Sequence, residues 1–299
     1  MDKAKRRILI TGTTGFVGHR LFEYLKSSTD WDVIGTSRSK GDFVDYAVDL
    51  TDSVSVCELA EFVPADIIIH TAAVSKTDEC EKNKESCYAA NVTSTQNLIS
   101  AYKNVKFVYF STYAVYNTPE GRCAETAPIS PTNYYIGTKI SGESLVHASQ
   151  GSIIFRPSVI FGFTAFERIS KNYFMQLLEN IRNNKVTRSP RDQFFNPIHV
   201  DIISEIIKKA VEKDISGTFN LGSNEDISKF EFNKTILRRF DFDEKYLEGI
   251  NSHSLEVSRP NNGAISSRHI QKTIGYRIPD LDQMIEMLYQ STCSYPLIR

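Results

Sequence analysis

The sequence predicts an α/β fold in which a doubly wound, parallel sheet is joined to a smaller C-terminal lobe. First, short apolar, strand-like runs alternate with helix-like segments through the first half of the chain, which is typical of a parallel sheet. Second, the first of these runs, residues 7–11, leads into a glycine-rich turn at the start of a helix. Third, 299 residues with 41% hydrophobic and 24% charged side chains suffice for one large α/β domain or for a domain with a smaller lobe.

The expected elements follow this alternation along the chain. Strands are expected at 7–11, 33–36, 44–48, 66–70, 106–111 and 152–156, and helices at 16–26, 53–62, 82–103 and 135–149. After Pro157 the pattern loosens, and helices are expected at 167–184, 201–213, 228–238 and 281–290, with one more strand at 218–221. We therefore expect a sheet domain over 1–160 and a lobe built mainly from 161–299, with some segments returning to the sheet domain.

Composition and cysteine usage limit the class of protein. The net charge of −1 gives no electrostatic footprint for nucleic acid. The basic residues near the start precede an apolar run too short for a signal peptide, and no run approaches the ~18 residues of a membrane span. The cysteines are odd in number and form no CxxC pair: Cys57, Cys80, Cys87, Cys123 and Cys293. We expect a cytoplasmic protein with reduced thiols, no nucleic-acid or membrane partner, and no metal site.

The turn after the first strand carries Gly12, Gly15 and Gly18. Gly12 permits a tight turn, Gly15 lets a pyrophosphate approach the helix N-terminus, and Gly18 lets the helix pack closely on the sheet. The spacing is GxxGxxG, not the GxGxxG of many dinucleotide sites. It indicates a Rossmann-like, NAD(P)-binding domain over 1–160, although glycines in such a turn can also be purely structural.

A second pattern lies at the start of the 135–149 helix, where Tyr135 and Lys139 are four residues apart and share one helix face. An ammonium about 4 Å from a phenolate attracts it by about 4 kcal/mol at an effective dielectric of about 20. That attraction would lower the tyrosine pKa by up to about 3 units, so the phenol could exchange a proton with a carbinol oxygen. This spacing is common on amphipathic helices, and the upstream glycine turn favours the functional interpretation.

Two hydroxyl residues, Ser111 and Thr112, stand at the end of the 106–111 strand. In open α/β sheets ligands bind beyond the carboxyl ends of the strands, so a hydroxyl here could bond the oxygen that Tyr135 protonates. We favour Thr112 for this role. The alternative is that the hydroxyl only caps the strand end.

The end of the second strand indicates which dinucleotide binds. Residues 36–40 contain no acid to accept from a ribose 2′-hydroxyl, whereas Arg38 and Ser37 could bind a 2′-phosphate. We therefore favour NADP(H). NAD(H) stays possible, because Arg38 could stack on adenine, and Asp42 or Asp45 could fold back toward the ribose.

Together these residues resemble the extended short-chain dehydrogenase/reductase family. Residues 11–18 resemble its TGxxGxxG turn, and His70 to Ala73 resemble its NAAA element with His in place of the first Asn. Thr112, Tyr135 and Lys139 fall on the catalytic Thr, Tyr and Lys of the family. The resemblance implies cofactor contacts at Gly12, Thr14, Gly15, Phe16, Val17, Gly18, Ser37, Arg38, Asp49, Leu50, Thr71, Ala72, Ala73, Asn91, Tyr135 and Lys139.

Within this family the chain is most similar to the dTDP-4-dehydrorhamnose reductase branch. The similar segments are 78–81, 135–143, 192–197 and 259–263. This implies an NAD(P)H-dependent reductase of a nucleotide-activated 4-keto-6-deoxy sugar, a homodimer, and substrate contacts from Ser111, Thr112, Arg191 and Arg259. Residues 111–116 are more similar to sugar-nucleotide epimerases, which makes an NAD-dependent epimerase the first alternative. A cofactor-binding regulatory subunit without catalytic activity is the second.

Overall fold

The parallel sheet expected from the sequence forms the centre of a computed structural model, which describes residues 5–118, 120–165, 172–254, 262–293 and 295. Its seven strands lie in the order β11-β6-β5-β4-β1-β2-β3, and every neighbouring pair is parallel. The strands are β1 (Arg7–Thr11), β2 (Asp32–Ser37), β3 (Tyr46–Ala47), β4 (Ile67–His70), β5 (Lys106–Phe110), β6 (Ile153–Pro157) and β11 (Gly217–Leu221). The α/β, doubly wound prediction is confirmed.

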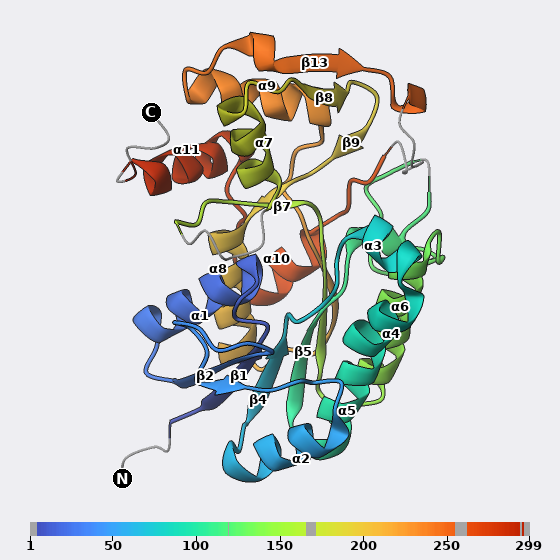
Figure 1. Cartoon of the computed structure of the whole chain (residues 1–299), viewed down its shortest axis with the longest axis vertical. Helices are drawn as coiled ribbons and strands as arrows, with labels where there is room; N and C mark the ends of the chain where they lie inside the picture. The colour runs from blue at the N-terminus through green and yellow to red at the C-terminus, as the bar shows by residue number, and fades with distance from the viewer. Residues whose placement is uncertain (1–4, 119, 166–171, 255–261, 294, 296–299) are drawn as a thin grey trace.

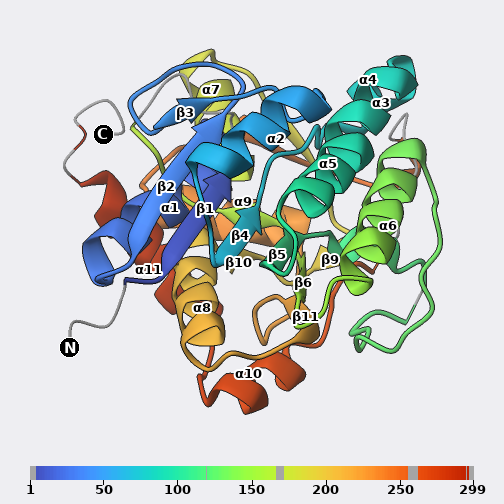
Figure 2. The same ribbon diagram turned by 90° about the horizontal axis from the view of Figure 1, so that it is seen from below.

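Helices cover both faces of the sheet (Figure 2). One face packs against α2 (Ser53–Phe62), α5 (Ser94–Ala101) and α6 (Tyr134–His147), and the other against α1 (Phe16–Ser28) and α8 (Val200–Glu212). Successive strand residues point to opposite faces, so Ile8 and Ile10 join one core cluster while Leu9 joins the other. Each central strand is therefore apolar on both sides, as the continuous hydrophobic runs predicted.

The helix expected over 82–103 is present as a continuous helical run over 84–101, and a break at its start separates it from a short helix that was not expected. The chain forms α3 (Thr77–Lys82), α4 (Lys84–Tyr88), a π-helical turn η1 (Ala89–Thr93) and then α5. The break falls at Asn83, whose side chain accepts a hydrogen bond from the backbone N–H of Ser86 at 3.2 Å and so caps α4. The cap lies at the edge of the expected range, so the element that the sequence did not predict is α3.

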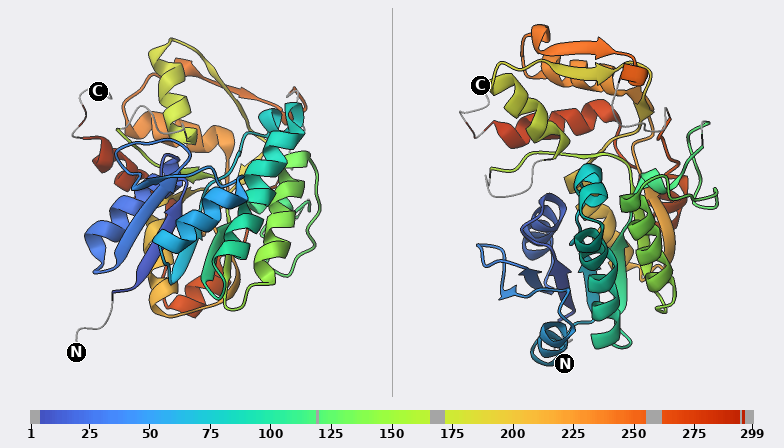
Figure 3. Two further views of the ribbon diagram at one scale, coloured as in Figure 1. Left: turned by 60° about the horizontal axis from the view of Figure 1, so that its bottom comes forward. Right: turned by 45° about the vertical axis from the view of Figure 1, so that its right-hand side comes forward.

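The second half of the chain returns to the sheet and also builds a separate layer. Strand β11 pairs with β6 at the sheet edge, and α8 packs on α1. Helices α7 (Tyr173–Arg182) and α9 (Lys229–Arg239) gather beyond the carboxyl ends of the strands, together with β8 (Thr187–Pro190) and β13 (Leu247–Ile250) (Figures 1 and 3). Helix α11 (Leu281–Thr292) matches the expected 281–290. Part of the expected 167–184 helix, residues 167–171, lies outside the described residues.

Several short elements were not expected from the sequence. They are β7 (Ile160–Phe161), β9 (Phe194–Phe195), β10 (Ile198–His199), β12 (Ile227–Ser228), α10 (Arg268–Ile274) and the 3-10 turns Tyr113–Val115, Glu244–Tyr246 and Ser252–Ser254. Four of these are two-residue strands, too short to show an alternating pattern. Across the described residues, none of the helices is both long and apolar enough to cross a membrane.

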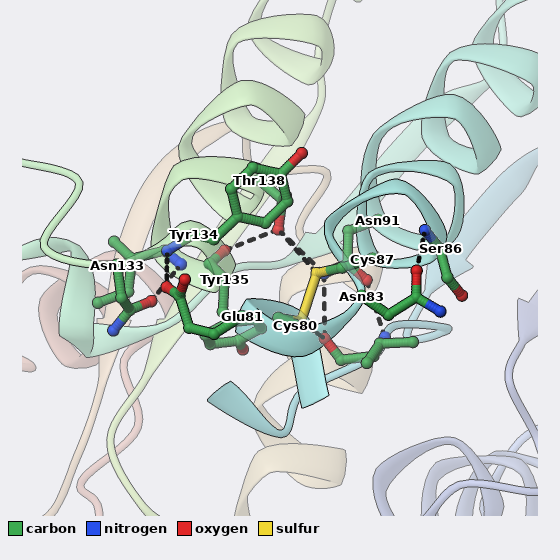
Figure 4. The surroundings of a disulfide bond; sticks show 12 residues. Cys80, Glu81, Asn83, Ser86, Cys87, Asn91, Asn133, Tyr134, Tyr135 and Thr138 are labelled. Atoms are coloured by element: carbon green, nitrogen blue, oxygen red, sulfur yellow. Dashed lines mark hydrogen bonds between the residues drawn. A yellow bond between two sulfur atoms is a disulfide. The ribbon is translucent and has the colours of Figure 1, made fainter. Parts of the chain in front are cut away.

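The expectation of reduced thiols is wrong for two of the five cysteines. Cys80 on α3 and Cys87 on α4 form a disulfide, while Cys57, Cys123 and Cys293 are free. The bend at Asn83 brings the two Cα atoms to 5.1 Å, within the usual range for a disulfide (Figure 4). No sequence pattern indicated this pair, because the bend that brings the two cysteines together was itself unexpected.

We expect loss of this disulfide to lower the free energy of unfolding by about 2.5 kcal/mol, because it closes a loop of about eight residues in the unfolded chain. In a protein of this size that corresponds to a fall in Tm of about 4 °C. The measurement is thermal unfolding of the native protein and of a Cys80→Ser, Cys87→Ser double variant, each with and without a thiol reductant. Cys57→Ser, at an exposed free cysteine, is the matched control. Equal midpoints for native protein with and without reductant would show that the bond does not form.

Candidate active site

The glycine turn has the geometry expected of an anion-binding site. Gly12 has φ +76°, and a Cβ there would lie 2.7 Å from the Cα of Ala72. A side chain at Gly18 would collide with the carbonyl of Gly12. Gly15 differs, because a Cβ there would approach nothing but the Gly12 carbonyl oxygen, at 3.1 Å. Open space therefore faces the start of α1, which has no side-chain cap and no acid in its first turn, so its N–H groups and positive end suit a phosphate.

The residues expected to contact the ribose end of a dinucleotide lie beside this turn. The hydroxyls of Thr14 and Ser37 lie 2.6 Å apart and join the glycine turn to the end of β2. Arg38, the next residue, is exposed. The carboxylate of Asp45 accepts from the backbone N–H of Gly35 at 2.7 Å, so one of its oxygens is engaged by β2. Both acids that could reverse the expected preference for NADP(H) are exposed, and Asp42 makes no such bond in the described structure.

Some of the remaining residues expected to contact the cofactor are exposed, and others are buried or hold the backbone in place. Asp49 is exposed and accepts from the backbone N–H and the hydroxyl of Thr51, as a turn residue does. Thr71 donates to the carbonyl of Thr11 at 2.6 Å, which fixes the segment after β4 against the glycine turn. Three others are packed in the interior: Phe16 and Leu50 are buried, and Val17 is partly buried. Ala72 is partly buried, and Ala73 is exposed.

His70 is a neutral structural residue. It is 1% exposed, and its ring nitrogens lie 2.7 Å from the hydroxyl of Thr11 and 3.0 Å from that of Thr95. Burial, together with the smaller effect of the Lys139 charge, lowers the pKa of His70 to about 3. A histidine with that pKa carries no proton to exchange at neutral pH, so the ring fixes the ends of β1 and β4.

Asn91 also has a structural environment. It lies in the π-helical turn and is buried. Its amide nitrogen donates to the carbonyl of Val74 and to the hydroxyl of Thr138, each at 3.0 Å, and its oxygen accepts from the Val74 N–H at 2.8 Å. The side chain thus joins the segment after β4 to α6. Its expected contact with a cofactor stays a prediction.

Thr112 and Tyr135 line the same cavity, which has a volume of about 760 Å³. It lies between α3 and the N-terminal end of α6, and Asp78 and Glu79 form part of its opposite wall. Asn133 places Tyr135 here by accepting from the N–H of Ile136 at 2.9 Å, which fixes the start of α6. Asp78, Glu79 and Tyr113, which also lines the cavity, were not among the predicted site residues, although the resemblance of residues 78–81 to the reductase branch was a signal.

The prediction that Lys139 lowers the pKa of Tyr135 is wrong. Burial raises the pKa of Tyr135 above its usual value, and the neighbouring Tyr113 adds to this rise. The cost of placing a phenolate in this site therefore exceeds any attraction to the ammonium. Tyr135 is a protonated phenol at neutral pH.

Lys139 is itself buried, with 3% of its surface exposed. Its Nζ lies 4.2 Å from the centre of the Tyr109 ring. Burial lowers the pKa of Lys139 to about 7, and the charge of Glu143 opposes this change. Tyr109 was also not among the predicted site residues, because a tyrosine within an apolar strand is interpreted as a core-packing residue.

Ser111 and Thr112 point in different directions, as neighbouring residues at a strand end do. Thr112 faces the cavity and also accepts from the N–H of Ala114 at 3.2 Å. The hydroxyl of Ser111 donates instead to the buried carboxylate of Glu143. Ser111 therefore belongs to the core beneath the site, and its expected contact with substrate stays a prediction.

Of the two arginines expected to bind substrate, Arg191 is not among the residues that line this cavity. The guanidinium of Arg191 lies 3.6 Å from the centre of the Phe230 ring, in the layer that contains α9. Arg259 lies outside the described residues.

Comparison with known proteins gives a consistent result. The family model described as RmlD substrate binding domain matches residues 6–293. Methionine adenosyltransferase 2 subunit beta of Rattus norvegicus is 26% identical over 285 residues, covering 92% of this chain and 84% of the relative. The probable low-salt glycan biosynthesis reductase Agl14 of Haloferax volcanii is 22% identical over 295 residues, covering 96% and 98%.

Among solved structures, dTDP-4-dehydrorhamnose reductase from Bacillus anthracis in complex with NADP matches with a TM-score of 0.84 at 23% identity, covering 96% of this chain and 100% of that one. dTDP-glucose 4,6-dehydratase from the same organism in complex with NAD matches with a TM-score of 0.80 at 17% identity, covering 98% of each chain. These likenesses confirm the Rossmann-like fold class. Because the family model spans nearly the whole sequence, the chain belongs to the RmlD substrate binding domain family.

Proposed function

We propose that this protein is an NADP(H)-dependent reductase of a nucleotide-activated 4-keto-6-deoxy sugar. The observation that carries the proposal is that Thr112 and Tyr135 line one cavity, with Lys139 one helical turn behind them. The uncapped start of α1 and the open space at Gly15 fit a dinucleotide pyrophosphate, and Arg38 and Ser37 would hold its 2′-phosphate. When bound, the nicotinamide would supply a hydride.

The protonation state of Tyr135 suits the direction of reduction. Because burial raises its pKa, Tyr135 holds its proton at neutral pH. It would donate that proton to the carbinol oxygen as negative charge develops there. Thr112, on the same cavity wall, would hydrogen-bond the same oxygen and stabilise its charge. Lys139 would hold the nicotinamide ribose.

The lining of the cavity and the relatives support a sugar nucleotide. Ser75, Thr77, Asn83, Thr132 and Asn133 add hydroxyl and amide groups to the two carboxylates of the wall, and such groups suit the hydroxyls of a sugar. A relative over nearly the whole chain is described as a glycan biosynthesis reductase, and a structural neighbour as dTDP-4-dehydrorhamnose reductase.

A regulatory subunit is the second candidate, and the relatives described as methionine adenosyltransferase 2 subunit beta favour it. Incubation of the purified protein with NADPH and nucleotide-linked 4-keto-6-deoxy sugars distinguishes the candidates. The proposal expects stoichiometric oxidation of NADPH. Sugar conversion without net oxidation indicates an epimerase. Absence of turnover, with tight binding to a methionine adenosyltransferase catalytic subunit, indicates the regulatory role.

We expect Tyr135→Phe to lower kcat by about 10²- to 10⁴-fold, because the variant has no proton to donate to the developing alkoxide. Affinity for NADPH should change little. The measurement is steady-state NADPH oxidation with the sugar substrate, together with a binding titration. Tyr134→Phe, at the preceding position of the same helix, is the matched control. An active Tyr135→Phe variant would remove Tyr135 from the chemistry.

We expect Arg38→Ala to weaken NADPH binding by about 10- to 100-fold, which corresponds to loss of a hydrogen-bonded ion pair with the 2′-phosphate. Binding of NADH should be nearly unaffected, because it lacks that phosphate. Fluorescence titration of both coenzymes measures this ratio. Lys40→Ala, at another exposed cation two residues away, serves as the comparison. Equal losses for NADPH and NADH would place Arg38 elsewhere on the dinucleotide.

A further inference from the structure

Tyr109 lies beneath Lys139 in the interface between the sheet and α6. It belongs to β5, is 1% exposed and faces the helix that carries Tyr135 and Lys139. The Nζ of Lys139 stands 4.2 Å from the centre of its ring, which is the geometry of a cation–π contact. In the described part of the chain, no hydrogen bond or ion pair joins this Nζ to another residue. The ring face is thus the closest partner that the structure gives to the Lys139 charge.

A glycine on α6 leaves room for the Tyr109 side chain. Gly142 stands three residues after Lys139, and a Cβ there would collide with the hydroxyl of Tyr109. That hydroxyl is buried and has no hydrogen-bond partner among the described residues. Burial of an unpartnered hydroxyl is unfavourable, so the polar end of the side chain does not explain its placement. The position of the aromatic ring under Lys139 explains why this side chain is a tyrosine buried against the helix.

The other titratable groups around Lys139 are either neutral or already paired with another residue. His70, on β4, is neutral in the folded protein. Glu143, one turn further along α6, is bound by Arg156 of β6 at 2.9 and 2.6 Å. Tyr135, one turn earlier, is a protonated phenol. The carboxylate of Glu143 is therefore the one anionic group that acts on Lys139 among the described residues, and it is already paired.

We propose that Tyr109 is a positioning residue, whose ring face seats the Lys139 ammonium on the cofactor side of α6. This inference rests on the proposed function, because it assigns the seated ammonium to the nicotinamide ribose. The negative face of an aromatic ring stabilises a desolvated cation more than an aliphatic side chain of similar size can. The face of the Tyr109 ring holds Nζ of Lys139 in place and favours its charged form, whereas burial favours the neutral form.

The test is the titration of Lys139, followed by NMR of protein labelled with ¹³C at lysine Cε. The Lys139 resonance is assigned by its loss in Lys139→Arg. Tyr109→Phe keeps the ring and removes the unpartnered hydroxyl, and Tyr109→Leu removes the ring. Phe107→Leu, at a buried aromatic two residues earlier on the same sheet face, is the matched control for lost aromatic packing. NADPH affinity across the same pH range is the second measurement.

We expect Tyr109→Phe and Phe107→Leu to leave the Lys139 midpoint unchanged and Tyr109→Leu to lower it by about one pH unit. The alkaline loss of NADPH affinity should move with it. An unchanged midpoint in Tyr109→Leu, or an equal fall in Phe107→Leu, would overturn the inference. The proposed function can fail independently of this inference. In that case the native protein neither binds nor oxidises NADPH, while the Lys139 midpoint still depends on the Tyr109 ring.

Discussion

The buried ion pair between Glu143 of α6 and Arg156 of β6 is the constraint on which the site geometry depends. The two side chains are 3% and 6% exposed and meet through two hydrogen bonds, at 2.9 and 2.6 Å. Arg156 also donates to Tyr116, whose hydroxyl donates to Asn220 of β11. Burying two charges is costly, and this paired geometry offsets the cost. Removal of one partner from such a pair costs about 3–5 kcal/mol, because the other charge is left buried.

This pair fixes the rotation of α6 about its own axis. Tyr135, Lys139 and Glu143 are successive residues at four-residue intervals, so they form one stripe along the helix. Glu143 anchors the inner end of the stripe to the sheet. Lys139 then lies over Tyr109, and Tyr135 reaches the cavity at the outer end. A fixed inner end thus determines where the phenol stands, which is the property a proton donor requires.

The sequence was informative where function depends on local spacing. The glycine turn, the Tyr135 and Lys139 pair and the alternating strands each repeat a short pattern whose physical basis is local, and the structure contains all three. It was uninformative where a feature depends on a distant partner. The hydroxyl of Ser111 turns to Glu143, 32 residues away, and the Cys80–Cys87 disulfide depends on the helix break at Asn83. The packing of Arg191 on Phe230 joins two segments that no sequence pattern connects.

The pKa of Tyr135 shows why spacing alone does not determine chemistry. The four-residue interval places the two residues on one helix face, and the expected fall in pKa assumed a separation of about 4 Å and an effective dielectric of about 20. The interior of this site penalises the phenolate more strongly than that assumption allows, so the pKa of Tyr135 rises. The same burial lowers the pKa of Lys139 to about 7. Both shifts disfavour charge, so Tyr135 is a neutral phenol and Lys139 is an amine that loses its proton readily. A phenol in this state can give its proton to an alkoxide, whereas it cannot accept a proton from an alcohol.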